Sequence, residues 1–442
     1  MTLAFGAPSG HPTPVTETFQ DIAGLPARRA ALDLLTAALA RRAGIEEATS
    51  TPGFGALSPR DRGFAHALVL ACLRHLGPID RALEGKIKKP PPERILNILR
   101  LGMAQAFVMG APAYAAVSAS VDLTGDSGAT RNFKGLVNAV LRGFTREPPD
   151  FTDPEAFAPP WLFTRWQAAY GRENALAMAK EIAAEPATDL SPKDPLASPE
   201  AALEIEVLAG GTWRTALRGE VSAWPGFTEG AWWVQDASAA VPVRLLNLKA
   251  GQTALDLCAA PGGKTLQMAA AGAQVVSVDR SAARLKRVEA NLGRMGLSAQ
   301  VVAADATQWA DKRQFDAVLL DAPCSATGTY RRNPDVLWAV RPGDIAALAE
   351  VQARMLQSAA RRVKPGGLLV YCVCSLEPEE GEAQVATFLK VTPSMVRDPI
   401  TLGEGGAPEA SLLPTGDLRI LPHHRSGGMD GFFVARFRRT TD

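Results

Sequence analysis

Cysteine and histidine are scarce in this sequence, with five of each in 442 residues. An odd number of cysteines in a chain of this length argues against a disulfide framework and favours a reducing compartment. The first 15 residues have neither a basic start nor an apolar stretch, so they do not resemble a signal peptide. No uninterrupted apolar run approaches the roughly 18 residues that a membrane span requires. We therefore expect a cytoplasmic protein.

Net charge is also small, +1 at pH 7, so the total charge does not identify a polyanionic partner. The basic residues are unevenly placed, because residues 1–150 contain 17 Lys and Arg against 13 Asp and Glu. Basic pairs stand at Arg28–Arg29, Arg41–Arg42 and Lys88–Lys89. A surplus of this size is more often a solvated surface than a nucleic-acid interface. Charge alone leaves both interpretations open.

The length and the hydrophobic pattern predict several domains. Residues 1–20 are rich in Pro, Gly and Thr, and we expect a disordered tail there. Apolar residues recur at spacings of three and four through residues 21–147, which predicts an all-α bundle. A proline-rich linker, a helical segment at 161–183 and a short mixed region follow. Residues 148–230 are therefore predicted to form a linker and a small mixed α/β subdomain.

The pattern changes after residue 231, where short apolar runs alternate with helical segments. Five of these runs are 254–257, 275–278, 299–302, 317–320 and 368–373. Strands that alternate with helices predict βαβ units and a mostly parallel sheet. A sixth run, 432–437, follows three glycines and is predicted to be an edge strand of the same sheet. Residues 231–442 are expected to form a Rossmann-like α/β domain.

A glycine-rich turn follows the first of these runs, in Asp256-Leu-Cys-Ala-Ala-Pro-Gly-Gly-Lys-Thr265. Ligands of open α/β sheets bind at the carboxyl ends of strands, where glycines let the backbone approach a ligand closely. Pro261 fixes a bend, and Gly262 and Gly263 lack side chains that would block an adenosine or methionine moiety. Without the G-x-G-x-x-G spacing, a dehydrogenase is disfavoured. Alone, the turn is equally compatible with a strand-to-helix connection that binds nothing.

Aspartates stand at the ends of the next three strands. Asp279 lies 16 residues past Gly263, where a doubly wound fold places a carboxylate that accepts hydrogen bonds from ribose hydroxyls. Asp305 follows the third strand, and Asp321 ends the fourth. Carboxylates are rarely buried without partners, so their recurrence favours a ligand site over packing. The pattern predicts a nucleoside-bearing cofactor other than NAD.

Two strand ends carry thiols, Cys324 after the fourth strand and Cys374 after the fifth. Because these strands end at the same edge of the sheet, we expect both thiols to face one pocket. A thiolate that adds to carbon 6 of cytosine breaks the aromaticity of the ring, and carbon 5 then attacks a methyl donor. Asp321 is well placed to stabilise such an adduct near the ring nitrogen. Cys324 is a candidate for assisting loss of the carbon-5 proton.

These cysteines also allow other interpretations. A single cysteine at a strand end is more often a small buried hydrophobe. The pair Cys372 and Cys374 suggests metal or redox chemistry, but no cluster of Cys or His completes a zinc site, so no metal is expected. We assign Cys258 and Cys372 to packing, and Cys72 to the apolar face of a helix.

At these motifs the sequence resembles the Fmu/RsmB (Sun) family of 16S rRNA cytosine-5 methyltransferases, within the RsmB/NOP group. The resemblance runs from about residue 25 to 440. Its signature segments are 258–265, 321–324 and 371–380, and the supporting matches are 234–236, 331–335 and 431–434. The resemblance also identifies the helical region as a NusB-like RNA-binding domain, through segments 61–64 and 134–142.

The resemblance implies methyl transfer from S-adenosyl-L-methionine to carbon 5 of a cytosine in ribosomal RNA, with 16S rRNA as the expected target. It implies Cys374 as the nucleophile and Cys324 as the residue that helps to release the product. Arg331 and Arg332 are placed to hold RNA phosphates at the pocket entrance. The implied cofactor contacts are Cys258, Ala259, Ala260, Pro261, Gly262, Gly263, Lys264, Asp279, Asp305 and Asp321.

The expected partner is 16S rRNA, free or within a small-subunit assembly particle, and we expect a monomer without a membrane or metal partner. Two alternatives remain. One is a tRNA or DNA cytosine-5 methyltransferase, although the DNA enzymes use the Pro-Cys thiol as nucleophile and the second thiol gives the better family match here. The other is an RNA-binding assembly factor with an inactive methyltransferase domain, against which the intact thiols and carboxylates count.

Overall fold

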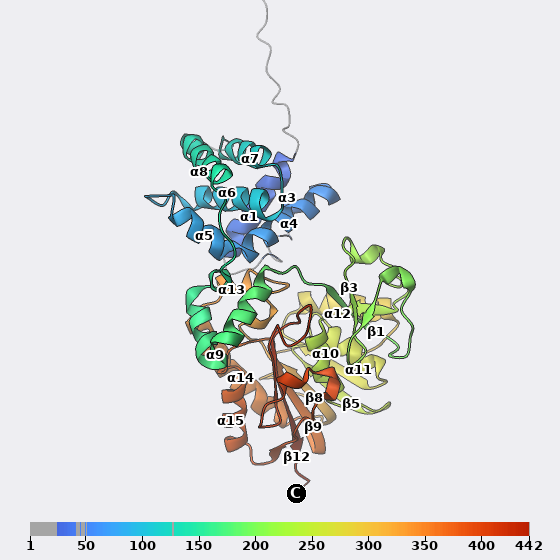
Figure 1. The fold of residues 1–442 in the computed structure, drawn as a ribbon. Coiled ribbons are helices and arrows are strands. Elements are labelled where there is room, and N and C mark those ends of the chain that lie inside the picture. The colour runs from blue at the N-terminus through green and yellow to red at the C-terminus, as the bar shows by residue number, and fades with distance from the viewer. Residues whose placement is uncertain (1–23, 41–44, 46–48, 50, 126–127, 442) are drawn as a thin grey trace, which may run out of the picture.

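The computed structural model describes residues 24–40, 45, 49, 51–125 and 128–441. The expected disordered tail, 1–20, and the basic pair Arg41–Arg42 lie outside the described residues. Figure 1 shows a helical domain next to a larger α/β domain, which carries the C-terminus, and a small sheet beside the latter. Among helices of the described residues, none combines the length and hydrophobicity that crossing a membrane requires.

All regular secondary structure among the described residues of the N-terminal domain is helical, which confirms the predicted all-α bundle. Its helices share one apolar core, to which Leu32, Leu68 and Ile98 contribute fully buried side chains. Local signals fix where helices begin, because the Ser58 side chain accepts a hydrogen bond from the Asp61 amide at the start of α4. The helices are α1 (Leu25–Ala40), α3 (Pro52–Gly55), α4 (Pro59–Arg74), α5 (Leu76–Glu84), α6 (Glu93–Met103), α7 (Ala113–Gly125) and α8 (Lys134–Arg146).

A long helix and a small antiparallel sheet connect this bundle to the α/β domain. Helix α9 (Pro160–Ala183) matches the predicted helical segment and is interrupted at Gly171, whose φ is 81°. The sheet has the strand order β2-β3-β1-β4 and encloses a core rich in tryptophan. Its strands are β1 (Thr188–Pro192), β2 (Glu206–Val207), β3 (Trp213–Thr215) and β4 (Trp232–Val234).

The C-terminal domain is built on one mixed sheet of strand order β10-β12-β9-β8-β5-β6-β7, with β11 paired to β12. The strands from β7 to β9 in this order are parallel, and β12 runs antiparallel to β9. This arrangement confirms the predicted Rossmann-like sheet. The strands are β5 (Thr253–Leu257), β6 (Gln274–Asp279), β7 (Gln300–Ala303), β8 (Phe315–Asp321), β9 (Val363–Val373), β10 (Met395–Arg397), β11 (Leu418–Ile420) and β12 (Phe432–Arg439).

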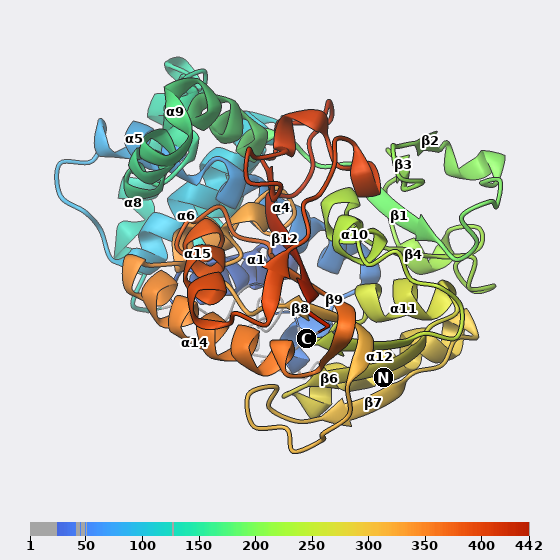
Figure 2. The same ribbon diagram turned by 90° about the horizontal axis from the view of Figure 1, so that it is seen from below.

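Helices cover both faces of this sheet, as Figure 2 shows. On one face α10 (Ala237–Arg244) and α11 (Gly263–Ala270) pack against side chains such as Leu319, and α12 (Ala282–Met295) packs beside them. On the other face α14 (Pro342–Ala360) and α15 (Glu382–Val391) pack against side chains such as Leu320. Leu319 and Leu320 are neighbours on β8 with opposite orientation, so the strand is buried on both sides.

One strand differs from the sequence prediction, because β12 does not lie at the edge of the sheet. It pairs with β9 on one side and with the short strands β10 and β11 on the other. The run Phe432–Phe437 is accordingly buried along its whole length. The edge position belongs to β10, whose three residues are too few to produce a hydrophobic period.

The helical and α/β domains meet at the segment that follows Cys324. The indole nitrogen of Trp338, on the short helix α13 (Val336–Ala339), donates to the Leu73 carbonyl at 3.1 Å. The Ile45 amide donates to the Asp335 carboxylate at 3.3 Å in a buried contact. The N-terminal domain therefore contacts the segment that follows Cys324, at Asp335 and Trp338.

Candidate functional site

A cavity of about 750 Å³ lies at the carboxyl ends of β5, β8 and β9. Parallel strands deliver their C-terminal residues to one edge of the sheet, which is where open α/β sheets bind ligands. Residues from β4, α12 and the loop before α13 complete the walls. The cavity is lined by the predicted residues Cys258, Ala259, Ala260, Pro261, Gly263, Lys264, Asp321 and Cys374.

The glycine turn forms one wall of this cavity. Gly262 has a φ of 109°, and a Cβ atom there would stand 3.2 Å from the Val288 side chain, so both its conformation and its packing require glycine. Asp279, at the end of β6, is 4% exposed and accepts hydrogen bonds from the amides of Ala260 and Ser281. Gly262 and Asp279 thus shape the turn but do not line the cavity themselves.

Asp256 is a buried carboxyl group at the base of the turn. Its Oδ2 accepts a hydrogen bond of 2.6 Å from the Thr265 hydroxyl, while Oδ1 has no partner. Burial in this apolar surrounding raises the pKa of Asp256 to about 7. An unpartnered acceptor in the cavity wall is a position at which a polar ligand atom gains a hydrogen bond.

Lys264 and Asp321 form an ion pair inside the cavity, with 2.7 Å between Nζ and Oδ2. Burial by itself lowers the pKa of Lys264, but Asp321 and the nearby thiols outweigh it and raise this pKa above its ordinary value. The other Asp321 oxygen accepts a contact of 3.4 Å from the Cys372 thiol. Asp321 is thus held at the base of the cavity with its charge compensated.

The two predicted thiols lie together, with 3.5 Å between the Sγ atoms of Cys324 and Cys374. Cys374 lines the cavity, whereas Cys324 stands directly behind it. The hydrogen bond to Cys374 and burial together raise the pKa of the Cys324 thiol. Burial and the Asp321 charge also raise the pKa of Cys372, which is 0% exposed and packs in the core, as predicted.

Two predicted site residues lie elsewhere. Asp305 is exposed after β7, outside the cavity lining, and its carboxylate accepts hydrogen bonds from Thr307. Its cofactor role stays a prediction. Arg331 does not stand at the entrance as predicted, because its side chain is 2% exposed, pairs with Glu181 and donates to the Gly427 carbonyl. Arg332 does line the cavity.

Sequence reasoning missed the partner of Arg332, which is the buried carboxylate of Asp430 in the loop before β12. Burial raises the pKa of Asp430 to about 6. Gln235 and Asp236, which follow β4, also line the cavity. Of these, only Gln235 and Asp236 had a sequence signal, since they belong to a segment that supported the family resemblance.

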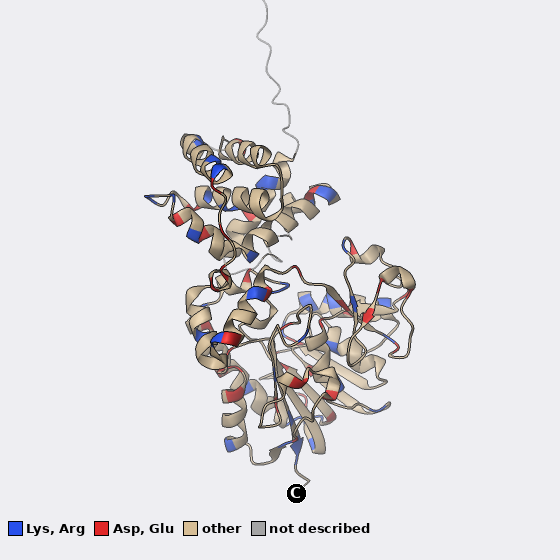
Figure 3. Cartoon of the chain, in the orientation of Figure 1, with Lys and Arg blue, Asp and Glu red and all other residues tan. Residues whose placement is uncertain are grey.

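The helical domain shows a different distribution of charge. In Figure 3 its Lys and Arg residues are spread over several helices with acidic residues between them. Of the two segments that carry the NusB-like resemblance, 61–64 lies at the start of α4 and 134–142 lies in α8. Arg62, in the first segment, donates to the carbonyls of Gly55 and Leu57, which is a structural role.

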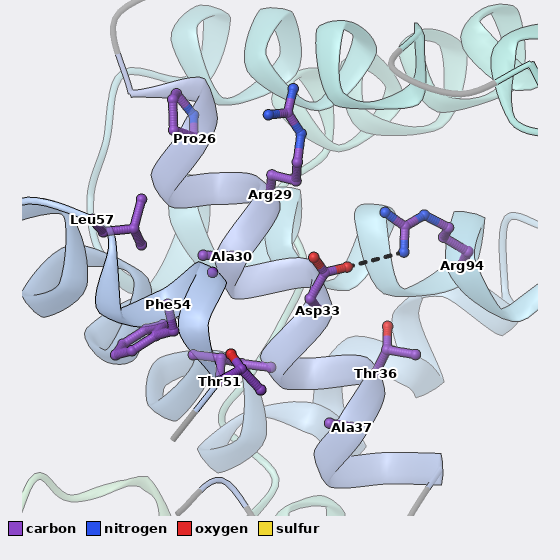
Figure 4. Close-up of a pocket in the computed structure, with 12 residues that line it drawn as sticks. Pro26, Arg29, Ala30, Asp33, Thr36, Ala37, Thr51, Phe54, Leu57 and Arg94 are labelled. Atoms are coloured by element: carbon purple, nitrogen blue, oxygen red, sulfur yellow. Dashed lines mark hydrogen bonds and ion pairs between the residues drawn. The ribbon is translucent and has the colours of Figure 1, made fainter. Parts of the chain in front are cut away.

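A second cavity, of about 480 Å³, lies between α1, α3 and α6 of this domain, and Figure 4 shows its lining residues. Asp33 and Arg94 form an ion pair of 3.2 Å at its wall, and Phe54 and Leu57 lie across from it. Among the residues that the structure describes, no group of three or more His, Cys, Asp or Glu side chains is arranged to hold a metal ion.

Comparison with known proteins gives two matching families. The family described as 16S rRNA methyltransferase RsmB/F matches residues 243–438, and the NusB family matches residues 25–146. Ribosomal RNA small subunit methyltransferase B of Vibrio cholerae is 36% identical over 410 residues, which cover 86% of this chain and 90% of that protein. A probable ribosomal RNA small subunit methyltransferase B of Synechocystis is 33% identical over 418 residues, which cover 87% of this chain and 92% of that protein.

Solved structures show the same fold. The crystal structure of PH0851 matches with a TM-score of 0.76 at 23% identity, and covers 95% of this chain and 100% of that one. A methyltransferase homolog from Pyrococcus horikoshii matches with a TM-score of 0.53 at 24% identity, and covers 64% of this chain and 95% of that one. These structures show the fold, while the matching families and the relatives confirm the family resemblance and the NusB-like domain inferred from the sequence.

Proposed function

The chain belongs to the RsmB/F family of 16S rRNA methyltransferases, and from this premise we propose that it transfers a methyl group from S-adenosylmethionine to carbon 5 of a cytosine in 16S rRNA. The relatives are named as small-subunit rRNA methyltransferases, and the match to this chain covers 90% and 92% of their length. Residues 25–146 of this chain match the NusB family and form the helical domain. The proposed partner is 16S rRNA, free or in an assembly particle, bound by a monomer.

The observation that carries the proposal is the pair of thiols, 3.5 Å apart, one of which, Cys374, lines the same cavity as the glycine turn. A methyltransferase that acts on an oxygen or an exocyclic nitrogen needs no second thiol, because its substrate atom is already nucleophilic. Carbon 5 of cytosine is not nucleophilic until a group adds at carbon 6. Two adjacent thiols fit the addition and the later elimination.

The residues of the turn fit S-adenosylmethionine. The backbone of Gly263 and the unpartnered Oδ1 of Asp256, both in the cavity wall, would hold its amino-acid part. Gly262 and Asp279 shape the turn from outside the cavity lining, and their contacts with the cofactor stay predictions from the sequence. The proposed contacts also include Cys258, Ala259, Ala260, Pro261 and Lys264 on the same wall. When bound, this cofactor supplies an electrophilic methyl group.

The protein residues then divide the work on the ring. The target base leaves its stack and enters the cavity, as base-modifying enzymes require. The Cys374 thiolate forms a bond to carbon 6, and the electron pair displaced toward the ring nitrogen is stabilised by a proton held at the Asp321–Lys264 pair. After carbon 5 is methylated, Cys324 acts as the thiolate, its own proton having passed to solvent, and accepts the carbon-5 proton. The electron pair of that C–H bond re-forms the double bond between carbons 5 and 6, and the C–S bond breaks with its electron pair on sulfur, which regenerates the Cys374 thiolate.

Substitution of each thiol tests this assignment. Cys374→Ala is expected to abolish radiolabelled methyl transfer to unmodified rRNA, since Cys374 is the thiol that lines the cavity at the end of β9. Cys324→Ala is expected to form the carbon-6 bond but not to break it, so a protein–RNA adduct should persist on a denaturing gel. Cys72→Ala, deep in the helical core, is the matched control and should turn over normally. Normal turnover by Cys374→Ala would falsify the nucleophile assignment.

The target RNA is a separate question. Bisulfite sequencing of RNA from a deletion strain is expected to show one 16S cytosine that loses its 5-methyl group. Loss confined to a tRNA would favour the alternative substrate. An unchanged methylation pattern would favour an assembly factor with an inactive domain.

A further inference from the structure

Each of the two thiols is followed in the chain by a serine, and both serines contact one carboxylate. The hydroxyls of Ser325 and Ser375 each donate to Oε2 of Glu380, at 2.5 Å. The Ser325 amide donates to Oε1 at 2.9 Å. Glu380 is 0% exposed and does not line the cavity. One buried side chain thus contacts the neighbour of each candidate catalytic residue.

The same carboxylate is itself held from the far side of the sheet. Gln352, on α14, donates to Glu380 Oε1 at 3.0 Å and to the Pro323 carbonyl at 2.9 Å. The Tyr371 hydroxyl, on β9, donates to the backbone carbonyl of Glu380 at 2.5 Å. Glu380 therefore has no freedom to follow the movement of either serine, because α14 and β9 fix it.

These contacts determine the relative position of the two loops. The Cys324 loop and the Cys374 loop leave different strands, and near the thiols the Gly328 amide of one donates to the Cys374 carbonyl of the other, at 2.9 Å. The Glu380 contacts add three donors from these loops to a single acceptor group. Hydrogen bonds to an ionised group are stronger than those between neutral groups, so this junction restrains the loops more than packing alone.

We propose that Glu380 is a positioning residue that sets the distance between the Cys324 and Cys374 sulfur atoms by binding the serine beside each. The inference rests on the proposed function for its catalytic meaning, because both thiols must reach one pyrimidine ring in turn. A misplacement of about 1 Å at a reacting atom lowers a rate by roughly a hundredfold. A fixed spacing between the sulfur atoms is therefore a requirement of the reaction.

The chemistry of the donors predicts which substitutions retain the function. Oε1 of Glu380 receives two N–H groups, which only donate, whereas Oε2 receives two hydroxyls, which also accept. A glutamine fits with its oxygen at the first position and its NH₂ donating to the hydroxyls at the second. Glu380→Gln should therefore keep the junction, and Glu380→Ala should lose it.

How favourably the two sulfur atoms are placed for bonding is measurable without RNA or cofactor, by thiol–disulfide exchange. The full chain is equilibrated in mixtures of reduced and oxidised glutathione, where one oxidised glutathione takes two hydrogens from the thiols, forms the Cys324–Cys374 bond and leaves two reduced glutathiones. Peptide mapping quantifies this disulfide separately from the other cysteines. Glu380→Ala is expected to lower the equilibrium constant by about tenfold or more, the equivalent of one hydrogen bond to a charged group.

Matched variants separate positioning from general damage. Glu380→Gln should stay within about threefold of the parent, since its four hydrogen bonds persist. Glu379→Ala removes the adjacent, half-exposed carboxylate that pairs with Arg165 and should leave the constant unchanged. Should Glu380→Ala fail to fold, Ser325→Ala and Ser375→Ala each remove one hydroxyl contact and are expected to lower the constant severalfold. A constant equal to that of the parent in Glu380→Ala, or in both serine variants, overturns the proposal.

Activity adds the second measurement. Methyl transfer by Glu380→Ala should lose kcat with little change in KM, and Glu380→Gln should restore it. If the disulfide constant changes as expected but the parent methylates no cytosine, the proposed function fails while the positioning role stands. If the parent methylates cytosine and Glu380→Ala has a parental constant and kcat, the positioning role fails alone.

Discussion

Replacing Asp256 with asparagine is expected to flatten the pH dependence of the stability of the α/β domain. The Asp256 carboxyl is 0% exposed, and only one of its oxygens accepts a hydrogen bond, from Thr265. Burial raises its pKa from 3.8 to about 7. The folded protein therefore holds a proton on this group over a range of pH in which the unfolded chain has already released it.

The sign and size of the effect follow from this difference. Stability from a raised carboxyl pKa is fully present below about pH 4 and is lost as the pH rises to about 7, since the charged form must then be buried. At about 1.4 kcal/mol for each pH unit, the full loss is about 4 kcal/mol. Between pH 5 and pH 8 most of this, about 3 kcal/mol, is expected to disappear from the parent. The side chain of the Asp256→Asn variant has no proton to lose, so the difference in stability between variant and parent should change by this amount.

Urea unfolding at pH 5 and pH 8 measures the change. The Asp256→Asn substitution places an NH₂ group where Oδ1 of the parent has no partner, which costs about 1–3 kcal/mol, but this cost is the same at both pH values and cancels. Asp316→Asn is the control, because a hydrogen bond from Lys364 lowers the pKa of Asp316 to about 2. Its effect should not change between pH 5 and pH 8. Parallel pH profiles for Asp256→Asn and the parent would refute the reasoning.

Two further predictions concern the contacts around the site. Trp338→Phe removes the hydrogen bond to the Leu73 carbonyl between the domains. Limited proteolysis of the linker at 148–160 should therefore be faster by up to about tenfold. Unchanged cleavage would show that this contact does not hold the domains together. Lys264→Met leaves the Asp321 carboxylate without its cation, so the rate of methyl transfer is expected to fall by about tenfold or more. An unaltered rate would exclude the ion pair from the reaction.

The sequence predicted the parallel part of the sheet because its inner strands β5, β6 and β8 are mostly buried on both faces. Each appears as a short, mainly apolar run, and the runs at 254–257 and 317–320 lie within β5 and β8. The prediction that β12 is an edge strand was wrong because β10, a strand of three residues, pairs with its outer side. So short a strand carries no periodic signal, and its pairing depends on contacts with a distant part of the chain.

In the site, too, residues marked by local sequence signals were predictable, and residues that depend on distant contacts were not. The glycine turn and the two thiols were predictable because strand ends are marked in the sequence and parallel strands end at one edge. The burial of Arg331 was not, since its partner Glu181 lies on α9, far away in sequence. Asp430 and its ion pair with Arg332 depend likewise on a loop that returns to the site only in the folded chain.

Both thiol loops are also held from the helical side of the molecule. On the Cys374 side, Arg165 of α9 pairs with Glu377 at 2.7 Å, and the Tyr170 hydroxyl donates to the Leu376 carbonyl. On the Cys324 side, the Tyr330 hydroxyl donates to the Met178 carbonyl of α9 at 2.7 Å. These contacts join the two loops to one helix. The N-terminal bundle adds a further contact at α13, where Trp338 donates to the Leu73 carbonyl. Because each contact with α9 lies within six residues of a thiol, the helical elements support the geometry of the reaction centre in addition to any role in contacting RNA.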